Sequence, residues 1–368
     1  MKNKRIKLVC LICMMLLAPA VCAHASEEKT AAEAVEEIRV GWNLGNSFAC
    51  CDERTAADGN KVNANSVSYY ETLWGNPETT QVMIHAVKEA GFNAVRIPVT
   101  YYNHIDSDGK IDEEWLSRIA EVVTYALNED MYVIINVHHD TGDGSEKPIQ
   151  ADLADIDEYK SYAQLLWKQI AMYFREYDSR LMFEGFNETL DMSAQNPWYG
   201  NEDSWRAMNI LNQSFVDVVR ATGGKNRTRN LIVNTYGSQT TSGPLDHFEV
   251  PKDKVYGHII VGAHTYVSSE KDIKNFMGTL FSRFAGKGIP VLVGEFGTPY
   301  WAEQKTRVNS AINFMNYGNM YGIKCFWWDD GGNYGLLDRK TLRWKYPQIV
   351  NGMMMAIEYA ESAAQGCF

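Results

Sequence analysis

Two glutamates, Glu188 and Glu295, are the residues of this sequence best placed to do chemistry. Glu188 ends the stretch Leu181–Glu188, and Glu295 lies near the end of Pro290–Gly297. Both stretches are apolar runs typical of buried strands, and a buried strand has no packing use for an acid at its tip. The two acids are 107 residues apart in the chain, so only a closed fold brings them together. Their placement predicts paired acid chemistry.

The elements that must position these acids alternate regularly along the chain. Eight apolar runs are predicted strands: Ile38–Leu44, Ala94–Pro98, Tyr132–Val137, Leu181–Gly185, Leu231–Thr235, His258–His264, Val291–Glu295 and Lys324–Trp328. Segments with helical period lie between and after them: Thr79–Ala90, Glu113–Leu127, Tyr159–Phe174, Ser204–Ala221, Lys271–Ala285, Arg307–Tyr321 and Tyr346–Tyr359. This alternation predicts an α/β fold with parallel strands. Eight repeats with acids at strand ends favour a (β/α)8 TIM barrel in a single domain.

Side chains alternate between the two faces of a strand, so parity predicts which of them face the mouth of the barrel. Arg96 alternates with aliphatic residues, which points it inward. His138 points inward by the same reasoning, and His139 points away or into the following loop. His264 and Tyr266 share the inner face of another strand. Parity therefore sends these polar residues toward the C-terminal ends of the strands, where active sites of such barrels lie.

A retaining glycosidase uses one carboxyl group to protonate the leaving oxygen and a second to attack the sugar carbon. Glu188 and Glu295 suit these roles, and a structural ion pair is the alternative. Parity makes no prediction for Glu295, because this acid shares it with the aliphatic Val291 and Val293. A buried arginine needs a partner, so Arg96 is expected either to hold Glu295 ionised or to form a salt bridge in the barrel core.

Other ionisable residues allow more than one interpretation. Glu184 shares parity with Glu188 but lies four residues earlier, and we interpret it as a buried structural acid with a cationic partner. His138, His139 and Asp140 suggest metal ligands, but parity splits the two histidines onto opposite faces. We therefore predict no metal, and we expect His138 to bind sugar hydroxyls.

Aromatic and amide side chains are candidates for binding sugar, because aromatic faces stack on the apolar faces of sugar rings. Trp328 shares parity with Phe326, so we expect Trp328 to form the floor of the sugar site and Trp327 to face outward. Asn43 and Asn46, at the end of the first strand, are candidates for hydroxyl contacts, although turn chemistry explains Asn43 equally well. Further candidates in loops are Trp74, Trp198, Tyr199 and Trp301.

The first residues of the chain predict a secretory leader. A basic start precedes the apolar run Leu8–Leu17, which is too short for a stable membrane anchor, and Ala23–Ala25 matches a small-x-small cleavage site. A retained membrane anchor is the alternative. We therefore interpret residues 1–25 as a signal peptide cleaved near Ala25, and residues 26–368 as a secreted catalytic domain.

Charge and cysteine content narrow the choice of partners. The formal net charge of the chain is −11, and losing the four basic residues of the leader brings it to −15. Such a surface repels phosphate backbones, so no nucleic acid partner is expected, but it does not oppose a neutral polymer. Four cysteines remain after the leader, for which we expect free thiols or at most one bridge: Cys50, Cys51, Cys325 and Cys367. We expect a monomer.

At this point the motifs carry a family likeness. The chain resembles glycoside hydrolase family 5 over nearly all of its mature length, and within it the subfamily 4 endo-β-1,4-glucanases. The matching blocks, in order, are Gly41–Asn46, Trp74–Pro77, Gly91–Val99, Asn136–Asp140, Phe186–Glu188, Ala263–Tyr266, Gly294–Gly297, Phe326–Asp329 and Gly335–Asp338. Each block is weak alone, and the set in this order is specific.

The resemblance implies retaining hydrolysis of β-1,4-glucan without a cofactor, with Glu188 as the acid/base and Glu295 as the nucleophile. It implies supporting roles for Arg96, His138, Asn187, His264 and Tyr266, and substrate contacts for Asn46, His139 and Trp328. It also implies a cis peptide bond after Trp328. Preference among cellulose, xyloglucan and mixed-linkage glucan stays open, and a mannanase is a more distant alternative. A barrel that binds oligosaccharide without cleaving it is the alternative from another class.

Overall fold

The structure, a computed structural model, describes residues 28–52 and 66–366. The predicted signal peptide and Cys367 lie outside the described residues. Eight parallel strands form a closed barrel in which each strand pairs with the next along the chain and β8 pairs with β1. The strands are β1 (Gly41–Leu44), β2 (Ala94–Ile97), β3 (Tyr132–Asn136), β4 (Leu181–Glu184), β5 (Leu231–Asn234), β6 (Ile259–Thr265), β7 (Val291–Phe296) and β8 (Lys324–Asp329). The prediction of a single-domain (β/α)8 TIM barrel is confirmed.

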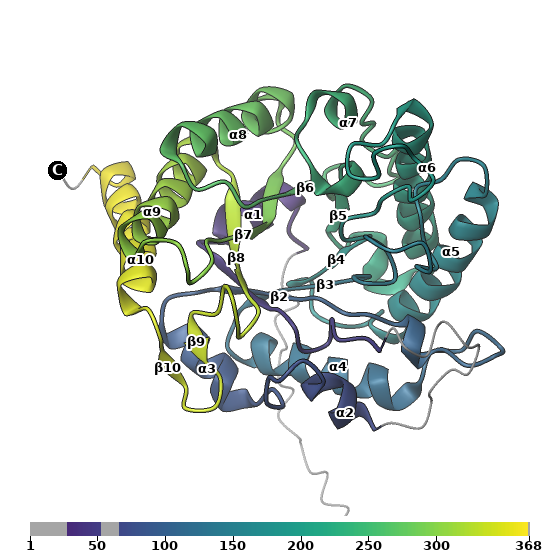
Figure 1. Cartoon of the computed structure of the whole chain (residues 1–368), viewed down its shortest axis with the longest axis horizontal. Coiled ribbons are helices and arrows are strands. Elements are labelled where there is room, and N and C mark those ends of the chain that lie inside the picture. Colours follow the sequence, from purple (N-terminus) through teal and green to yellow (C-terminus); the bar gives the residue numbers. More distant parts are fainter. Residues whose placement is uncertain (1–27, 53–65, 367–368) are drawn as a thin grey trace, which may run out of the picture.

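Helices surround the barrel as predicted (Figure 1). The predicted ones are α3 (Gln81–Glu89), α4 (Glu113–Asn128), α5 (Ile156–Tyr173), α6 (Glu202–Ala221), α8 (Glu270–Arg283), α9 (Gln304–Tyr321) and α10 (Pro347–Ala364). Elements that the sequence did not predict are α1 (Ala31–Glu37), α2 (Val67–Thr72), α7 (Ser242–Asp246) and the hairpin of β9 (Leu337–Asp338) with β10 (Arg343–Trp344). Each has seven residues or fewer, which is too short for a clear periodic signal.

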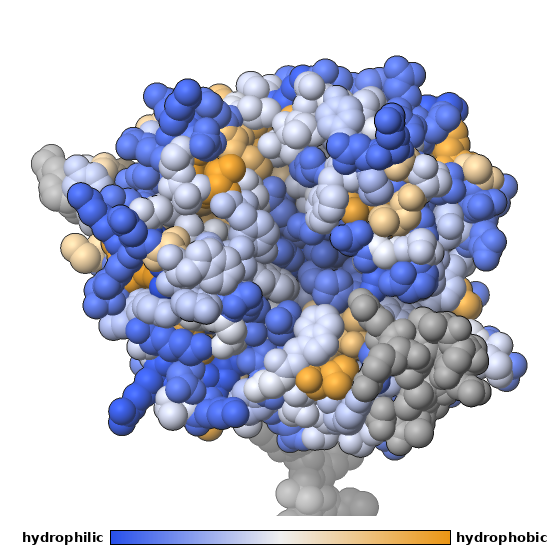
Figure 2. All heavy atoms as spheres, viewed as in Figure 1, coloured by the Kyte–Doolittle hydropathy of each residue, from blue (hydrophilic) through white to orange (hydrophobic). Residues whose placement is uncertain are grey.

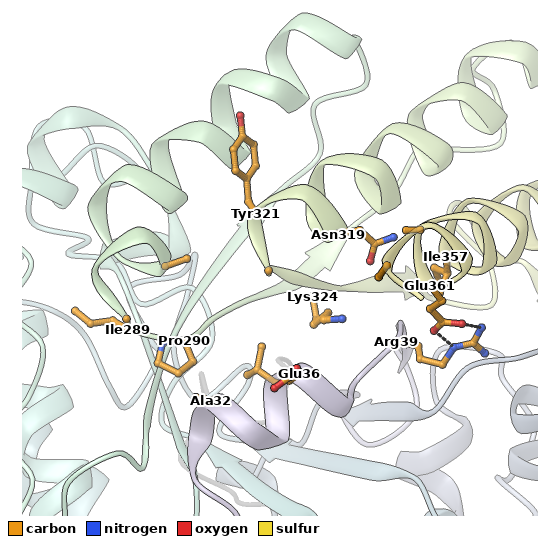
Figure 3. A pocket seen from close by; sticks show the side chains of 16 residues that line it. Ala32, Glu36, Arg39, Ile289, Pro290, Asn319, Tyr321, Lys324, Ile357 and Glu361 are labelled. Carbon is orange, nitrogen blue, oxygen red and sulfur yellow. Dashed lines mark hydrogen bonds and ion pairs between the residues drawn. The ribbon is translucent and has the colours of Figure 1, made fainter. Parts of the chain in front are cut away.

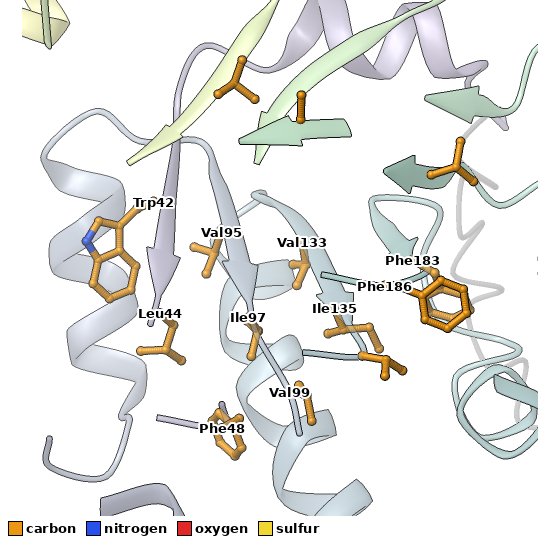
Figure 4. Close-up of a cluster of buried hydrophobic side chains, with 14 of the residues drawn as sticks. Trp42, Leu44, Phe48, Val95, Ile97, Val99, Val133, Ile135, Phe183 and Phe186 are labelled. Carbon is orange, nitrogen blue, oxygen red and sulfur yellow. The ribbon is translucent and has the colours of Figure 1, made fainter. Parts of the chain in front are cut away.

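The outer faces of the strands form an apolar layer beneath the helices (Figure 4). Its members on the first three strands are Trp42, Leu44, Val95, Ile97, Val133 and Ile135, all fully buried. They occupy alternate positions, so the residues between them face the interior of the barrel. Burial of this layer stabilises the barrel and fixes the direction of the polar side chains at the strand ends.

Helix α1 closes the N-terminal end of the barrel. Thr30 caps it in a capping box: its side-chain oxygen accepts from the Glu33 amide at 3.3 Å, and the Glu33 carboxylate accepts from the Thr30 amide at 2.8 Å. The apolar residues of this segment and of the barrel interior form a second buried cluster: Ala31, Ala34, Val35, Ile38, Ala94, Tyr132, Ile134, Met182, Ile232, Ile260, Leu292 and Phe326.

A cavity of about 620 Å³ lies beside α1, next to the first residues of β7 and β8 (Figure 3). It is lined by Lys324, Glu36 and an ion pair in which Arg39 Nε lies 2.7 Å from Glu361 Oε1. The positive and negative groups in this lining are equal in number, so it has no strong preference for one charge. Among the described residues, no helix has the length and apolar character needed to cross a membrane.

Candidate active site

The two acids meet at the C-terminal end of the barrel. Glu188 lies four residues after the end of β4, and Glu295 is the second-to-last residue of β7. One carboxylate oxygen of each and a ring nitrogen of His264 all lie within 4.8 Å of one another. The face presented in Figure 1 is hollowed near its centre, and hydrophilic residues line much of the hollow (Figure 2). The closed fold thus brings together two acids that are far apart in the sequence.

A β-bulge in β7 explains why Glu295 faces the interior although it shares parity with outward-facing valines. Val293 pairs with Ala263, whereas Glu295 pairs with His264, so Gly294 is an extra residue in β7. A Cβ atom at Gly294 would lie only 2.8 Å from His264 Nε2. Glycine is therefore required at this position, and the bulge reverses the alternation just before the acid.

Arg96 links the two strands that carry the acids, and all five of its N–H groups have acceptors. Its Nη1 donates to Glu295 Oε1 at 2.7 Å and to Asn43 Oδ1 at 3.0 Å. Its Nε donates to Glu184 Oε2 at 2.6 Å, while Nη2 donates to Glu184 Oε1 at 2.7 Å and to Asn187 Oδ1 at 2.9 Å. Glu184 thus has the cationic partner that its sequence position predicted, and Arg96 both contacts Glu295 and forms a core salt bridge.

The surroundings of Glu295 favour its ionised form. Burial raises the pKa of Glu295, but the charges of His264 and Arg96 and a hydrogen bond from Tyr266 lower it, and the net pKa lies below the ordinary value. The Tyr266 hydroxyl donates to Glu295 Oε2 at 2.6 Å. An ionised carboxylate held by two donors is the state that a nucleophile requires.

Glu188 has a different environment. Its side chain is 23% exposed, whereas that of Glu295 is 5% exposed. His264 Nδ1 lies 3.0 Å from Glu188 Oε1. Burial lowers the pKa of His264, but the Glu295 charge and the hydrogen bond to Glu188 raise it above the ordinary value overall. Glu188 therefore has the solvent access that proton exchange needs, and a neighbour that couples it to Glu295.

His138 and His139 do not lie on opposite faces, so that prediction is wrong. Strand β3 ends at Asn136, and strand alternation no longer applies to the two residues beyond it. Their ring centroids are 4.5 Å apart, and His139 also lies 5.5 Å from Trp74. Burial lowers the pKa of His138 well below its ordinary value and that of His139 to about 4. Both rings are neutral near pH 7 and can exchange hydrogen bonds with hydroxyl groups.

The structure offers one group of three potential metal ligands among its described residues: Glu188, His264 and Glu295. The Arg96 guanidinium lies 2.7 Å from Glu295, and its charge opposes a cation there. The hydrogen bond between His264 and Glu188 already occupies two of the candidate ligand atoms. These contacts favour acid–base chemistry at this site, and the absence of a metal stays a prediction.

Tryptophan orientations follow the predicted parity, but one backbone prediction is wrong. Trp327 is fully buried, and its indole donates to the Tyr334 carbonyl at 3.0 Å. Trp328 stacks nearly parallel to His138, with ring centroids 5.8 Å apart and an interplanar angle of 12°. The peptide bond after Trp328 is trans, the form that residues other than proline prefer by about 3 kcal/mol. The assignment of Trp328 as the floor was tied to a cis bond and is withdrawn with it, and its stacking on His138 leaves Trp328 a candidate sugar contact.

Asn43 supports the structure of the site, whereas Asn46 is a candidate contact for the sugar. Asn43 is fully buried and accepts from Arg96, so it is not available for sugar hydroxyls. Asn46 follows β1 in a left-handed conformation with φ 56°, and its carbonyl accepts from Asn76 at 2.8 Å. Its side chain is partly exposed, and it remains a candidate contact.

Sequence reasoning missed Asn234. Its side-chain amide donates to Glu184 Oε1 at 2.9 Å and to the Phe186 carbonyl at 2.8 Å. It therefore holds both the acid that pairs with Arg96 and the turn that leads to Glu188. Asn234 shares parity with the inward-facing Ile232, so the parity argument used for Arg96 would have found it.

A (β/α)8 barrel with two glutamates facing each other at its C-terminal end defines a glycoside hydrolase of the barrel type. The model of the cellulase family, glycosyl hydrolase family 5, matches residues 55–333. The chain belongs to this family and is a glycoside hydrolase of the cellulase type, as its sequence motifs predicted.

Known proteins support the same assignment. The chain is similar to a broad-specificity subfamily 4 endoglucanase from Ruminococcus champanellensis with bound cellotriose, at TM-score 0.83 and 35% identity over 89% of this chain and 99% of that one. It is similar to a family 5 enzyme from Prevotella bryantii in complex with a xyloglucan tetradecasaccharide, at TM-score 0.82 and 35% identity over 90% and 99%. It is 33% identical to Endoglucanase B of Neocallimastix patriciarum over 91% of this chain and 73% of that protein.

Proposed function

We propose that this protein is a secreted, retaining endo-β-1,4-glucanase that cleaves β-glucan chains by double displacement, with Glu188 as acid/base and Glu295 as nucleophile. The observation that carries the proposal is the contrast between the two acids. Glu295 is buried between a guanidinium and a phenol, whereas Glu188 is partly exposed and contacts a histidine. Such a division suits one ionised and one proton-exchanging carboxyl group.

The spacing of the acids supports retention. One oxygen of Glu188 and one of Glu295 lie within 4.8 Å of each other. Retaining enzymes have carboxyl groups about 5–5.5 Å apart, whereas inverting enzymes leave about 6.5–9.5 Å for a water molecule. The short distance between the two acids therefore supports the retaining arrangement.

The mechanism has two steps. Glu295 attacks the anomeric carbon while Glu188 protonates the leaving oxygen, so a glycosyl ester replaces the glycosidic bond. Glu188 then accepts a proton from water, the water oxygen bonds to the anomeric carbon, and the electron pair of the ester bond returns to Glu295. The product keeps the configuration of the substrate.

The other predicted residues support these steps. Arg96 and Tyr266 keep Glu295 ionised before attack and stabilise it as a leaving group afterwards. The side-chain oxygen of Asn187 accepts a hydrogen bond from Arg96, so the amide N–H groups of Asn187 stay available for a sugar hydroxyl. Asn46, His139, the neutral His138 and Trp328 are the proposed sugar contacts.

The proposed substrate class rests on the similarity of this chain to enzymes that act on or bind β-1,4-linked glucans. One similar structure is described as a broad-specificity endoglucanase and holds cellotriose, and another holds a xyloglucan fragment. Xyloglucan or mixed-linkage glucan is therefore the nearest alternative to unbranched β-1,4-glucan. The basic, apolar and small-residue pattern of residues 1–25 supports secretion.

The test is release of reducing sugar from carboxymethylcellulose, xyloglucan, lichenan and mannan by purified protein. We expect release from at least the first of these and little from mannan. Binding of glucan by well-folded protein without release from any of the four would favour the alternative of an oligosaccharide-binding barrel.

A further inference from the structure

Glu184, the deeper acid beneath the site, is buried and pairs with the same arginine that contacts Glu295. We propose that Glu184 is a positioning residue that balances the charge of Arg96 throughout the reaction, so that Glu295 stays reactive as a nucleophile. This inference rests on the proposed retaining mechanism and assigns a kinetic consequence to a residue outside the catalytic pair.

The geometry of Glu184 is that of a permanent counter-charge. Its side chain is 1% exposed, and both of its oxygens pair with Arg96, at 2.6 and 2.7 Å. Its Oε1 also accepts from Asn234 at 2.9 Å and from Asn136 at 3.4 Å. It lies at the end of β4 and cannot reach solvent or substrate without breaking these bonds. Of the groups that Glu184 contacts, Arg96 is the charged one and the one that also contacts Glu295.

The charge of the cluster changes during the reaction. Before attack, Arg96 faces two carboxylates, Glu184 and Glu295. In the glycosyl ester Glu295 has no charge, and Glu184 is then the only one of the two that balances the buried guanidinium. A buried charge without a partner is strongly destabilising, so Glu184 stabilises the intermediate relative to the free enzyme. Without it, the attraction of Arg96 for Glu295 would oppose ester formation.

Loss of this charge should affect the two steps differently. Glu184→Gln keeps the shape but removes the negative charge, so Arg96 holds Glu295 more tightly as an ion. Attack on the substrate then becomes slower. Hydrolysis of the ester, in which Glu295 departs as an ion, is not slowed. A merely structural role would instead reduce both steps together.

The experiment measures pH profiles and steady-state rates for wild type, Glu184→Gln and Glu184→Asp. On 2,4-dinitrophenyl β-cellobioside, ester hydrolysis limits kcat because the leaving group needs no protonation. For Glu184→Gln we expect kcat/KM to fall about tenfold, kcat to stay within about twofold, and the acidic limb of kcat/KM to move down by about one pH unit. Glu184→Asp keeps the charge but forms a weaker pair with Arg96. It should show the same changes to a smaller extent, with the acidic limb moving down by a few tenths of a pH unit.

Asn234→Ala is the matched control, because it removes a neutral neighbour of the same carboxylate. Its acidic limb should not move down. If Glu184→Gln does not fold, the smaller shift in Glu184→Asp decides the matter. An acidic limb that stays in place or moves up, with kcat and kcat/KM falling in parallel, would overturn the role of Glu184 alone. A wild-type protein that hydrolyses neither the aryl glycoside nor any glucan would overturn the proposed function, and this inference with it.

Discussion

The two ends of the barrel are built from the same eight strands and have opposite chemistry. At the N-terminal end, Ala34 of α1 and Ile38, which follows the helix, face an apolar interior, and every member of that cluster is at least nine-tenths buried. At the C-terminal end, charged groups lie in the core: Arg96 is fully buried and Glu295 is 4% exposed. The comparison teaches that apolar packing at one end provides the stability with which the other end holds buried charges in place.

The cavity beside α1 fits this contrast between the two ends of the barrel. The cavity of about 620 Å³ beside α1 is far from the two acids in the fold, and its charged groups are balanced. The acids instead lie together at the C-terminal end of the barrel. The groups lining that cavity do not converge on one point, whereas Glu188, His264 and Glu295 do, and such convergence is typical of functional sites.

The largest effect should come from the proposed nucleophile, Glu295. We expect Glu295→Ala to lose at least about 10³-fold in kcat on glucans, equivalent to about 4 kcal/mol in the barrier, with little loss of thermal stability. It should form no covalent intermediate on any substrate, and with azide any rescued product should have the α configuration. Mass spectrometry of the protein and NMR of the product measure both.

Glu188→Ala is the matched variant at the other acid. It should lose activity on glucans yet still become glycosylated by a substrate whose leaving group needs no proton. The ester should then persist, and azide should release a β-glycosyl azide from it. The opposite anomers from the two variants would mean that the roles of the two acids are reversed.

An effect of intermediate size, on stability, should come from a change at the N-terminal end of the barrel. Ile38→Ala removes a fully buried side chain from the buried cluster at the N-terminal end of the barrel. It should lower the free energy of unfolding by about 2–5 kcal/mol. The kcat at low temperature should change little, because no catalytic group lies near this residue. Val82→Ala, on an exposed position of α3, is the control and should change stability by less than about 0.5 kcal/mol. A loss of kcat without loss of stability in Ile38→Ala would contradict the division between the two ends.

The smallest effect concerns the pH profile. The Tyr266 hydroxyl lowers the pKa of Glu295, so Tyr266→Phe should raise that pKa. Glu295 must be ionised for attack, and the acidic limb of kcat/KM should therefore move to higher pH, by about one unit. The two acids are coupled, so the limbs report the pair rather than single residues. A limb that moves to lower pH would show that Tyr266 does not stabilise the ionised acid.

Parity predicted the inward direction of Arg96, which lies within β2, and of Tyr266, which lies one residue beyond the end of β6 and still reaches Glu295. It made no prediction for Glu295, because the bulge at Gly294 depends on how β6 and β7 pair and leaves no local pattern. It failed for His139, which lies beyond the end of β3. The barrel itself was predictable from eight repeats of strand and helix. Helix α1 was not, because seven residues give too little periodicity and its apolar face has meaning only against the barrel interior.

The anomeric configuration of the first product tests the central claim most directly. Hydrolysis of a cello-oligosaccharide followed by proton NMR within the first minutes records the product before it mutarotates. The account predicts that the β anomer appears first, because two displacements at the same carbon retain configuration. Initial appearance of the α anomer would contradict it and would make the enzyme an inverting one.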